Sequence, residues 1–229
     1  MLVPILGVAK KVKTAGPSLT TKAPAAHGGP AQFIHRGPSG AQSFALTFHG
    51  AGDLVPTRAI LATTKRLSVP ITVFAVGTWV EQHKDLIREM VAAGHELANH
   101  TQTHPALRRV DRAGVAAEIT GCANALRQVT GSIGAWFRPS GTPTPTTMML
   151  EEAAKAGYST VVGYDVDPLD YQDPGTDAIA SRVVADTRAG SIVSLHLGHP
   201  GTAGAIEAIV HQLRKKGLTA VTVSTLLRG

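Results

Sequence analysis

The chain has 229 residues, of which 43% are hydrophobic and 17% charged, and its formal net charge is +6. This length suffices for one large domain with a hydrophobic core, and the composition excludes a mostly disordered chain. The single cysteine, Cys122, excludes an internal disulfide and a cysteine-rich zinc site. Any metal bound here must therefore be held by histidine and carboxylate side chains.

Residues 1–40 are rich in Ala, Gly, Pro, Ser and Thr and predict a flexible leader, followed by one folded domain at residues 41–229. No acidic residue precedes Asp53, whereas five of the 22 basic residues do, so the rest of the chain has a net charge of only +1. Aromatic residues make up only 4% of the chain. A nucleic-acid-binding face combines basic side chains with stacking aromatics on the folded domain, so we expect no nucleic-acid partner.

The apolar run at residues 2–9 is far shorter than the about 20 residues that cross a bilayer. Lysines follow this run, whereas a secretory signal has its positive charges before the apolar segment. We therefore expect no membrane span and no complete signal or anchor in these residues.

After the leader, short apolar runs alternate with amphipathic stretches. In chain order, the pattern predicts a strand at 43–48, a helix at 56–67, a strand at 71–76, a helix at 78–93, a strand at 95–98, a helix from the cap Asp111 to about 129, a short apolar segment at 136–138, a helix at 144–156, a strand at 159–163, a helix at 177–188, a strand at 191–195, a helix at 205–216 and a last strand at 218–223. About seven strands interleaved with about six helices predict a parallel α/β fold, either a barrel or an open doubly wound sheet. The glycine-rich phosphate-binding motifs do not occur, which argues against nucleotide binding.

Polar residues follow five of the predicted strands. These segments are residues 49–53, 99–105, 138–141, 164–171 and 196–200. In parallel α/β folds the carboxyl ends of the strands meet at one mouth, where function lies. The sequence therefore predicts one site built from these five segments.

Two histidines and one aspartate in these segments predict a metal site. His100 and His104 are four residues apart, a spacing that on a helical turn places both imidazoles on one face. Asp53 is the acid nearest the end of the first strand, which makes it the natural third ligand. Two histidines, one carboxylate and an open position are typical of a hydrolytic zinc site, and such a metal lowers the pKa of bound water to about 7.

The order of these motifs resembles the polysaccharide deacetylases of carbohydrate esterase family 4, the NodB homology domain, over about residues 43–227. His100 and His104 match the motif H-[ST]-x-x-H, whose histidines bind the metal. Arg138, within Phe-Arg-Pro, matches the motif whose arginine orients the catalytic base. Asp170 and Tyr171 resemble the end of D-x-x-D-W, with Tyr in place of Trp.

A last motif completes the resemblance: Leu195 matches the leucine that lines the acetyl pocket, and His196 matches the general acid. The resemblance implies a distorted (β/α) barrel with about seven strands in a single domain. It also implies a metal-dependent hydrolase that removes acetyl groups from N-acetylated sugars of a peptidoglycan-like or chitin-like glycan. The expected cofactor is zinc, with cobalt, nickel and manganese as alternatives, and the protein is expected to be an extracytoplasmic or secreted monomer.

The first motif departs from the family pattern. The family has T-F-D-D-G, in which the first Asp is the base and the second a metal ligand, whereas this chain continues from Phe48 with His49, Gly50, Ala51, Gly52 and Asp53. In one interpretation the glycine-rich loop folds back, so that Asp53 acts as ligand or base and His49 as base or further ligand. In the other, the site has lost its carboxylates and the chain is a weak or inactive glycan-binding homologue.

The first interpretation assigns a role to each remaining residue. Asp53 or His49 removes the proton of the attacking water, and His196, held charged by Asp170, protonates the leaving amine. Arg138 orients the carboxylate that faces it. Leu195 and Tyr171 shape the acetyl pocket.

Other residues have simpler interpretations. Arg138 itself could be a buried ion-pair partner, and Cys122 is interpreted as a buried small apolar residue. Strand-end caps, loop positions or the surface are the expected places of Asp165, Asp167, His199, His27, His35, His83 and His211.

Overall fold

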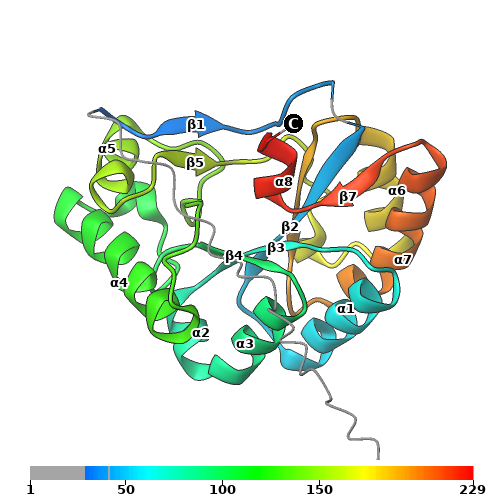
Figure 1. Cartoon of the computed structure of the whole chain (residues 1–229), viewed down its shortest axis with the longest axis horizontal. Helices are drawn as coiled ribbons and strands as arrows, with labels where there is room; N and C mark the ends of the chain where they lie inside the picture. The colour runs from blue at the N-terminus through cyan, green and yellow to red at the C-terminus, as the bar shows by residue number, and fades with distance from the viewer. Residues whose placement is uncertain (1–28, 41, 229) are drawn as a thin grey trace, which may run out of the picture.

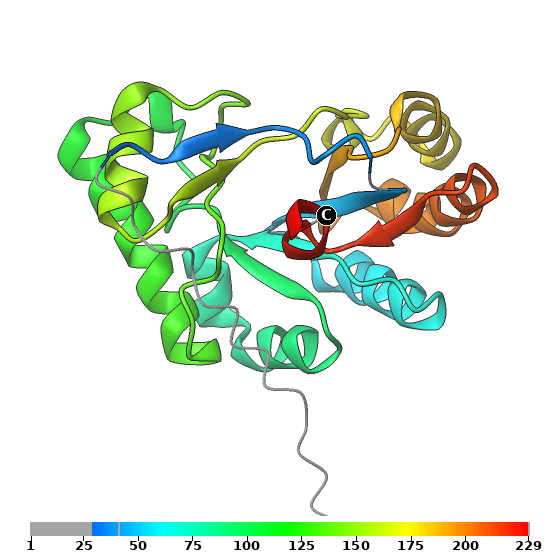
Figure 2. The same cartoon turned by 45° about the horizontal axis from the view of Figure 1, so that its top comes forward.

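Parallel strands form the centre of the molecule, and helices surround them (Figures 1 and 2). The computed structural model describes residues 29–40 and 42–228. The strands are β1 (Gln32–Ile34), β2 (Ser43–Gly50), β3 (Thr72–Ala75), β4 (Glu96–Asn99), β5 (Thr160–Val162), β6 (Ile192–His196) and β7 (Thr219–Val221). The helices are α1 (Leu54–Arg66), α2 (Gly77–Gln82), α3 (Lys84–Ala92), α4 (Arg112–Thr130), α5 (Thr147–Lys155), α6 (Thr176–Asp186), α7 (Pro200–Lys215) and α8 (Val223–Arg228), with short 3₁₀ turns at Leu107–Arg109 and Asp170–Gln172.

The strands form two parallel groups that isolated bridges join into a distorted barrel. One group has the order β4-β3-β2-β6, with β7 also paired to β2, and the other is β1-β5. Phe137 bridges Asn99 on one side and Val161 on the other, which links β4 to β5. Val166 bridges Val193 in β6 and so continues the ring on the other side. The predicted α/β barrel is therefore confirmed.

Alternation along β2 separates two environments. Phe44 and Phe48 belong to the main hydrophobic core, which lies between the strands and the helices. Ala45 belongs to a smaller cluster inside the barrel, together with Phe74. Since side chains alternate along a strand, His49 points into the same interior as Ala45.

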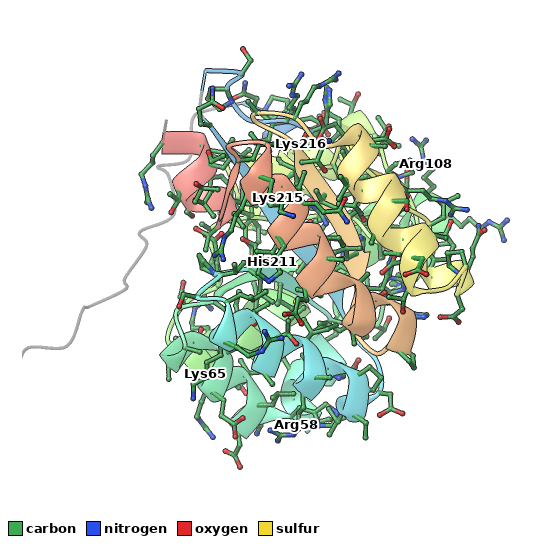
Figure 3. All side chains as sticks on the ribbon, turned by 90° about the vertical axis from the view of Figure 1, so that its right-hand side faces the viewer. Arg58, Lys65, Arg108, His211, Lys215 and Lys216 are labelled. Carbon is green, nitrogen blue, oxygen red and sulfur yellow. The ribbon has the colours of Figure 1, made fainter. Side chains whose placement is uncertain are left out.

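The helices begin and end at residues that satisfy their free backbone groups. The Asp111 carboxylate caps α4 by accepting from the Gly114 N–H at 2.8 Å, as predicted. Lysines and arginines occupy the last turns of α1 and α7, where a positive charge is favourable. Figure 3, in which the right-hand side of Figure 1 faces the viewer, labels Lys65 of α1 and Lys215 of α7.

Three elements differ from the prediction. β1 lies within the predicted leader, where a strand of three partly exposed residues gives no visible alternation; residues 1–28 lie outside the described residues. The helix predicted at 78–93 is divided at His83, whose φ of −125° and ψ of 42° are not helical. Its apolar pattern continues across the break because both halves pack on the same core. The last predicted strand ends early, and α8 follows it.

No helix among the described residues is long and apolar enough to span a membrane.

Candidate active site

The end of β2 brings His49 into the mouth of the barrel. β2 and β6 pair in register, with His49 opposite His196, and the two imidazoles stack with centroids 4.4 Å apart and planes at 10°. Gly50 follows, and it allows β2 to pass close to β3: a Cβ at this position would lie 2.7 Å from Val73 Cγ1 and 2.9 Å from Ala75 Cα. The backbone therefore leaves no room for a side chain at residue 50.

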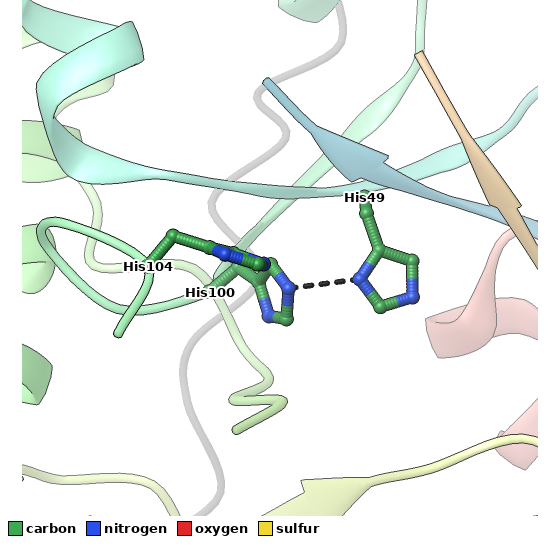
Figure 4. A group of neighbouring side chains, drawn as sticks. All are labelled: His49, His100 and His104. Atoms are coloured by element: carbon green, nitrogen blue, oxygen red, sulfur yellow. Dashed lines mark hydrogen bonds between the residues drawn. The ribbon is translucent and has the colours of Figure 1, made fainter. Parts of the chain in front are cut away.

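Three histidines converge at this mouth (Figure 4). One ring nitrogen of each of His49, His100 and His104 lies within 4.8 Å of those of the other two. His100 directly follows β4, and the loop after it turns back through left-handed backbone at Thr101 (φ 70°) and at His104 (φ 60°). The predicted helical turn is thus a loop, but the two imidazoles still meet. Among the described residues, this convergent group contains no carboxylate.

Asp53 lies outside this group. Its carboxylate caps α1 by accepting from the Val55 N–H at 2.8 Å, and the residue is exposed. The loop before it is fixed by a close approach between Gly52 and Gly198, since a Cβ on Gly52 would lie 2.8 Å from Gly198 Cα. The loop therefore does not bring Asp53 to the two histidines, as the interpretation of Asp53 as ligand or base requires, and His49 is the third member of the convergent group.

Hydrogen bonds define which nitrogens of the cluster carry protons. His100 Nδ1 lies 2.8 Å from the Arg138 carbonyl oxygen, which only accepts, so this nitrogen carries hydrogen and Nε2 has the lone pair. His49 Nδ1 lies 2.8 Å from that Nε2. On its other side, His49 Nε2 lies 2.9 Å from the Ser194 hydroxyl.

The surroundings of these imidazoles favour their neutral form, although His104 is exposed at the mouth. Burial lowers the pKa of His49 well below its ordinary value, and the nearby His100 lowers it further. Burial likewise lowers the pKa of His100 well below its ordinary value, with His104 as the next cause, and it lowers the pKa of His104. Neutral imidazole is the form that ligates metals.

Arg138 lies beneath the cluster in the barrel interior. It is only 1% exposed, and it donates to Thr47 Oγ1 at 2.9 Å and to the carbonyl oxygens of Val162 and Gly163. Its guanidinium stacks on the Phe74 ring at 3.9 Å. These acceptors are all neutral, so the buried ion-pair interpretation does not hold among the described residues. Burial lowers the pKa of Arg138 to about 9.

The buried Asp170 pairs with the partly exposed His196 beside the cluster. Asp170 is 0% exposed; its Oδ1 accepts from His196 Nδ1 at 2.8 Å, and its Oδ2 accepts from the His196 backbone N–H at 2.7 Å. The Thr202 hydroxyl donates to the same Oδ2 at 2.6 Å. These contacts place the proton on His196 Nδ1 and leave Nε2 as a base.

The two residues predicted to contact the substrate, Tyr171 and Leu195, lie in different environments. Tyr171 is 46% exposed, and its ring centroid lies 5.2 Å from that of His196, at the mouth. Leu195 is 0% exposed and packs in the core between the strands and the helices. Since neighbouring strand residues face opposite sides, Leu195 points away from the interior that His196 faces. The acetyl-pocket role predicted for Leu195 is therefore corrected, and Ser194 is the neighbour that faces the interior.

Several other polar residues have structural partners. Asp165 accepts from the Ile192 N–H, and Asp167 accepts from the Leu169 N–H. Cys122 is buried in α4, and His199 pairs with Asp173 at 2.9 Å near the surface. Of the histidines expected at the surface, His27 lies outside the described residues.

The geometry defines a class of site. Three imidazoles within reach of one ion suit a divalent metal of the zinc type, and the Asp170–His196 pair beside them has the chemistry to transfer protons. Both lie at the carboxyl ends of the strands of a (β/α) barrel, where hydrolases of this architecture carry their chemistry.

Comparison with known proteins identifies the family. Residues 36–161 match the polysaccharide deacetylase family. A chitooligosaccharide deacetylase of Bradyrhizobium sp. (strain ANU 289) is 40% identical over 171 residues, which cover 71% of this chain and 74% of that protein. A peptidoglycan-N-acetylglucosamine deacetylase of Bacillus cereus is 29% identical over 201 residues, which cover 83% and 91%. The chain therefore belongs to the polysaccharide deacetylase family.

Solved structures show the same fold with two functional outcomes. The Bc1960 peptidoglycan N-acetylglucosamine deacetylase superposes with a TM-score of 0.81 at 26% identity, covering 86% of this chain and 94% of that one. BA3943 of Bacillus anthracis, described as a CE4 family pseudoenzyme, superposes with a TM-score of 0.80 at 25% identity, covering 86% and 69%.

Proposed function

We propose that this protein removes acetyl groups from N-acetylglucosamine units of a chitin-like or peptidoglycan-like glycan, with a divalent metal held by His49, His100 and His104. The observation that carries the proposal is the convergence of these three imidazoles next to the hydrogen-bonded Asp170–His196 pair. Zinc suits this donor set best, and cobalt, nickel and manganese are alternatives. Two of the relatives are named as deacetylases of chitooligosaccharide and of peptidoglycan, and a glycan of the cell envelope implies an extracytoplasmic location.

When bound, the metal would lower the pKa of a coordinated water and polarise the amide carbonyl. His196 Nε2 accepts the proton of the attacking water as the new carbon–oxygen bond forms. The resulting imidazolium is stabilised by Asp170 and then donates this proton to the leaving nitrogen as the carbon–nitrogen bond breaks. One residue thus performs both proton transfers, which suits a site without a carboxylate at position 49. The products are acetate and a free amine.

The remaining residues bind and orient. Tyr171, half exposed at the mouth, offers an apolar ring against which a sugar can stack. Arg138 adds positive charge beneath the carbonyl that becomes negative during attack, and its contacts to Thr47 and two carbonyl oxygens hold it rigidly.

A second candidate is glycan binding without turnover. The convergent group has no carboxylate from the described part of the chain, and this absence and the likeness to a pseudoenzyme both favour it. Both candidates use the same mouth of the barrel and the same sugar, so activity separates them.

Acetate release from N-acetylglucosamine oligomers tests the proposal, after chelation and with zinc restored. We expect release by the zinc-loaded wild type, loss of release in His49→Ala, and retention in the matched variant Asp53→Ala, which removes only a helix cap worth about 1 kcal/mol of stability. Absence of release under every metal, with oligomer binding intact, would establish the binding candidate. Equal release by His49→Ala and wild type would remove His49 from the site.

A further inference from the structure

We propose that Ser194 is a positioning residue, whose hydroxyl contacts the outer nitrogen of His49 and accepts the hydrogen bond of this nitrogen in the tautomer that metal binding requires. The inference rests on the function proposed above, because it concerns the same metal site. No motif of the family resemblance singles out Ser194, and it does not touch the reacting atoms.

The position of Ser194 follows from the pairing of β2 with β6. Thr47 is opposite Ser194, and His49 is opposite His196, so Ser194 reaches His49 diagonally across the two strands. Ser194 is 1% exposed, and its Oγ lies 2.9 Å from His49 Nε2. The Thr47 hydroxyl is directed elsewhere, since it donates to the Val193 carbonyl oxygen. Among the described residues, Ser194 is therefore the group that contacts the outer nitrogen of His49.

Without metal, the contacts place the His49 proton on the inner nitrogen. His100 Nδ1 donates to the Arg138 carbonyl oxygen, so His100 Nε2 must accept from His49 Nδ1–H. A neutral imidazole has one N–H, so His49 Nε2 then accepts from the Ser194 hydroxyl.

Metal binding reverses this arrangement. For His49 Nδ1 to offer its lone pair, the proton must move to Nε2, and this buried N–H then needs an acceptor. A serine hydroxyl can serve in both states, because it rotates from donor to acceptor without moving its oxygen. Partners that fix the outer nitrogen of a ligating histidine typically change metal affinity about 10–100-fold when removed.

Zinc affinity, measured by competition with a chromophoric chelator, tests the role in four proteins: wild type, Ser194→Ala, Ser194→Thr and Ser191→Ala. We expect Ser194→Ala to bind zinc about 10–100-fold more weakly, and Ser194→Thr, which keeps a hydroxyl, to restore most of the affinity. Ser191 is a matched control, since it is also buried and hydrogen-bonded but contacts Asp165 instead of the cluster. Thermal unfolding of the metal-free variants checks that each is folded.

Imidazole ¹⁵N chemical shifts report the tautomer of His49 independently of catalytic activity. In the wild type, we expect the His49 proton to move from Nδ1 to Nε2 when zinc is added. A Ser194→Ala variant that binds zinc as tightly as wild type and shows the same shift would overturn the role of Ser194 while leaving the metal site intact. A wild type that binds no zinc would instead overturn the proposed function, and this inference with it.

Discussion

The Asp170–His196 pair is the part of the site whose role can be tested by changing one atom. In Asp170→Asn the oxygen at the Oδ2 position keeps its two donors, the His196 backbone N–H and the Thr202 hydroxyl. The amide NH₂ must then occupy the Oδ1 position, where it faces His196 Nδ1. A donor at that place forces Nδ1 to accept, and the ring proton moves to Nε2. His196 thereby loses the lone pair with which it takes a proton from water.

The structure sets the size of the two effects. One of three hydrogen bonds to a charged acceptor is reversed, and such a bond contributes about 1.5–3 kcal/mol. Part of this loss is offset, because the substitution also removes a fully buried charge. We therefore expect the free energy of unfolding to fall by less than about 3 kcal/mol, so that the variant folds. General acid–base catalysis contributes about 100- to 10,000-fold, and kcat should fall by that amount.

Denaturant unfolding and acetate release measure these two quantities, and the ¹⁵N shifts of His196 report the tautomer directly. Asp173→Asn is the matched control, since Asp173 faces His199 in an exposed Asp–His pair and its loss should change stability by less than about 0.5 kcal/mol. A folded Asp170→Asn protein with wild-type kcat would refute the assignment of both proton transfers to His196.

Three further predictions follow from burial and backbone geometry. Gly52→Ala should lower stability by about 2 kcal/mol or more in a denaturant titration, because its Cβ would lie 2.6 Å from the Leu197 carbonyl oxygen at a φ of 146°; an unchanged midpoint would contradict the close approach. Cys122 should react with thiol reagents only after unfolding, since burial raises its pKa to about 12; rapid labelling of the native protein would contradict this. Burial also lowers the pKa of His95, whose Nδ1 accepts from the Ile71 N–H, so the unfolded chain takes up a proton first as the pH falls below about 6.5 and stability falls with it. His95→Gln should make this loss smaller in metal-free protein, and equal pH slopes for variant and wild type would exclude the contribution.

Much of the barrel could be predicted from the sequence because local patterns encode it. Alternating apolar runs and amphipathic stretches predicted β2 and α1. The polar segments after the strands predicted that the site lies at the carboxyl ends of the strands. The motif spacing also predicted that His100 and His104 would meet, although by a helical turn instead of a left-handed loop. β1 could not be predicted, since three residues are too few for a period to be visible.

The errors within the site come from contacts that sequence spacing does not show. Asp53 is close to β2 in sequence, but the N–H groups at the start of α1 also attract a carboxylate, and they hold it there. Leu195 adjoins His196 in sequence and therefore faces the opposite side of the strand. The same two-residue period predicts that Ser194 lies on the face of β6 that carries His196, and therefore points into the barrel interior.

The first motif of this chain has His49 and Gly50 where the family pattern has two aspartates, and this difference makes the charge of the site more positive. Imidazole ligands are neutral, so in the proposed metal site His49 would leave the full charge of a divalent ion uncompensated, where an aspartate would cancel part of it. Arg138, buried on neutral acceptors, adds a further positive charge. Such a site favours negative charge on a substrate carbonyl oxygen but has no carboxylate at position 49 to act as base. Asp170 is the buried carboxylate beside the cluster, and all its contacts hold His196 or Thr202. In the mechanism proposed above, turnover therefore depends on His196 to a greater degree than it would with a separate aspartate base at position 49.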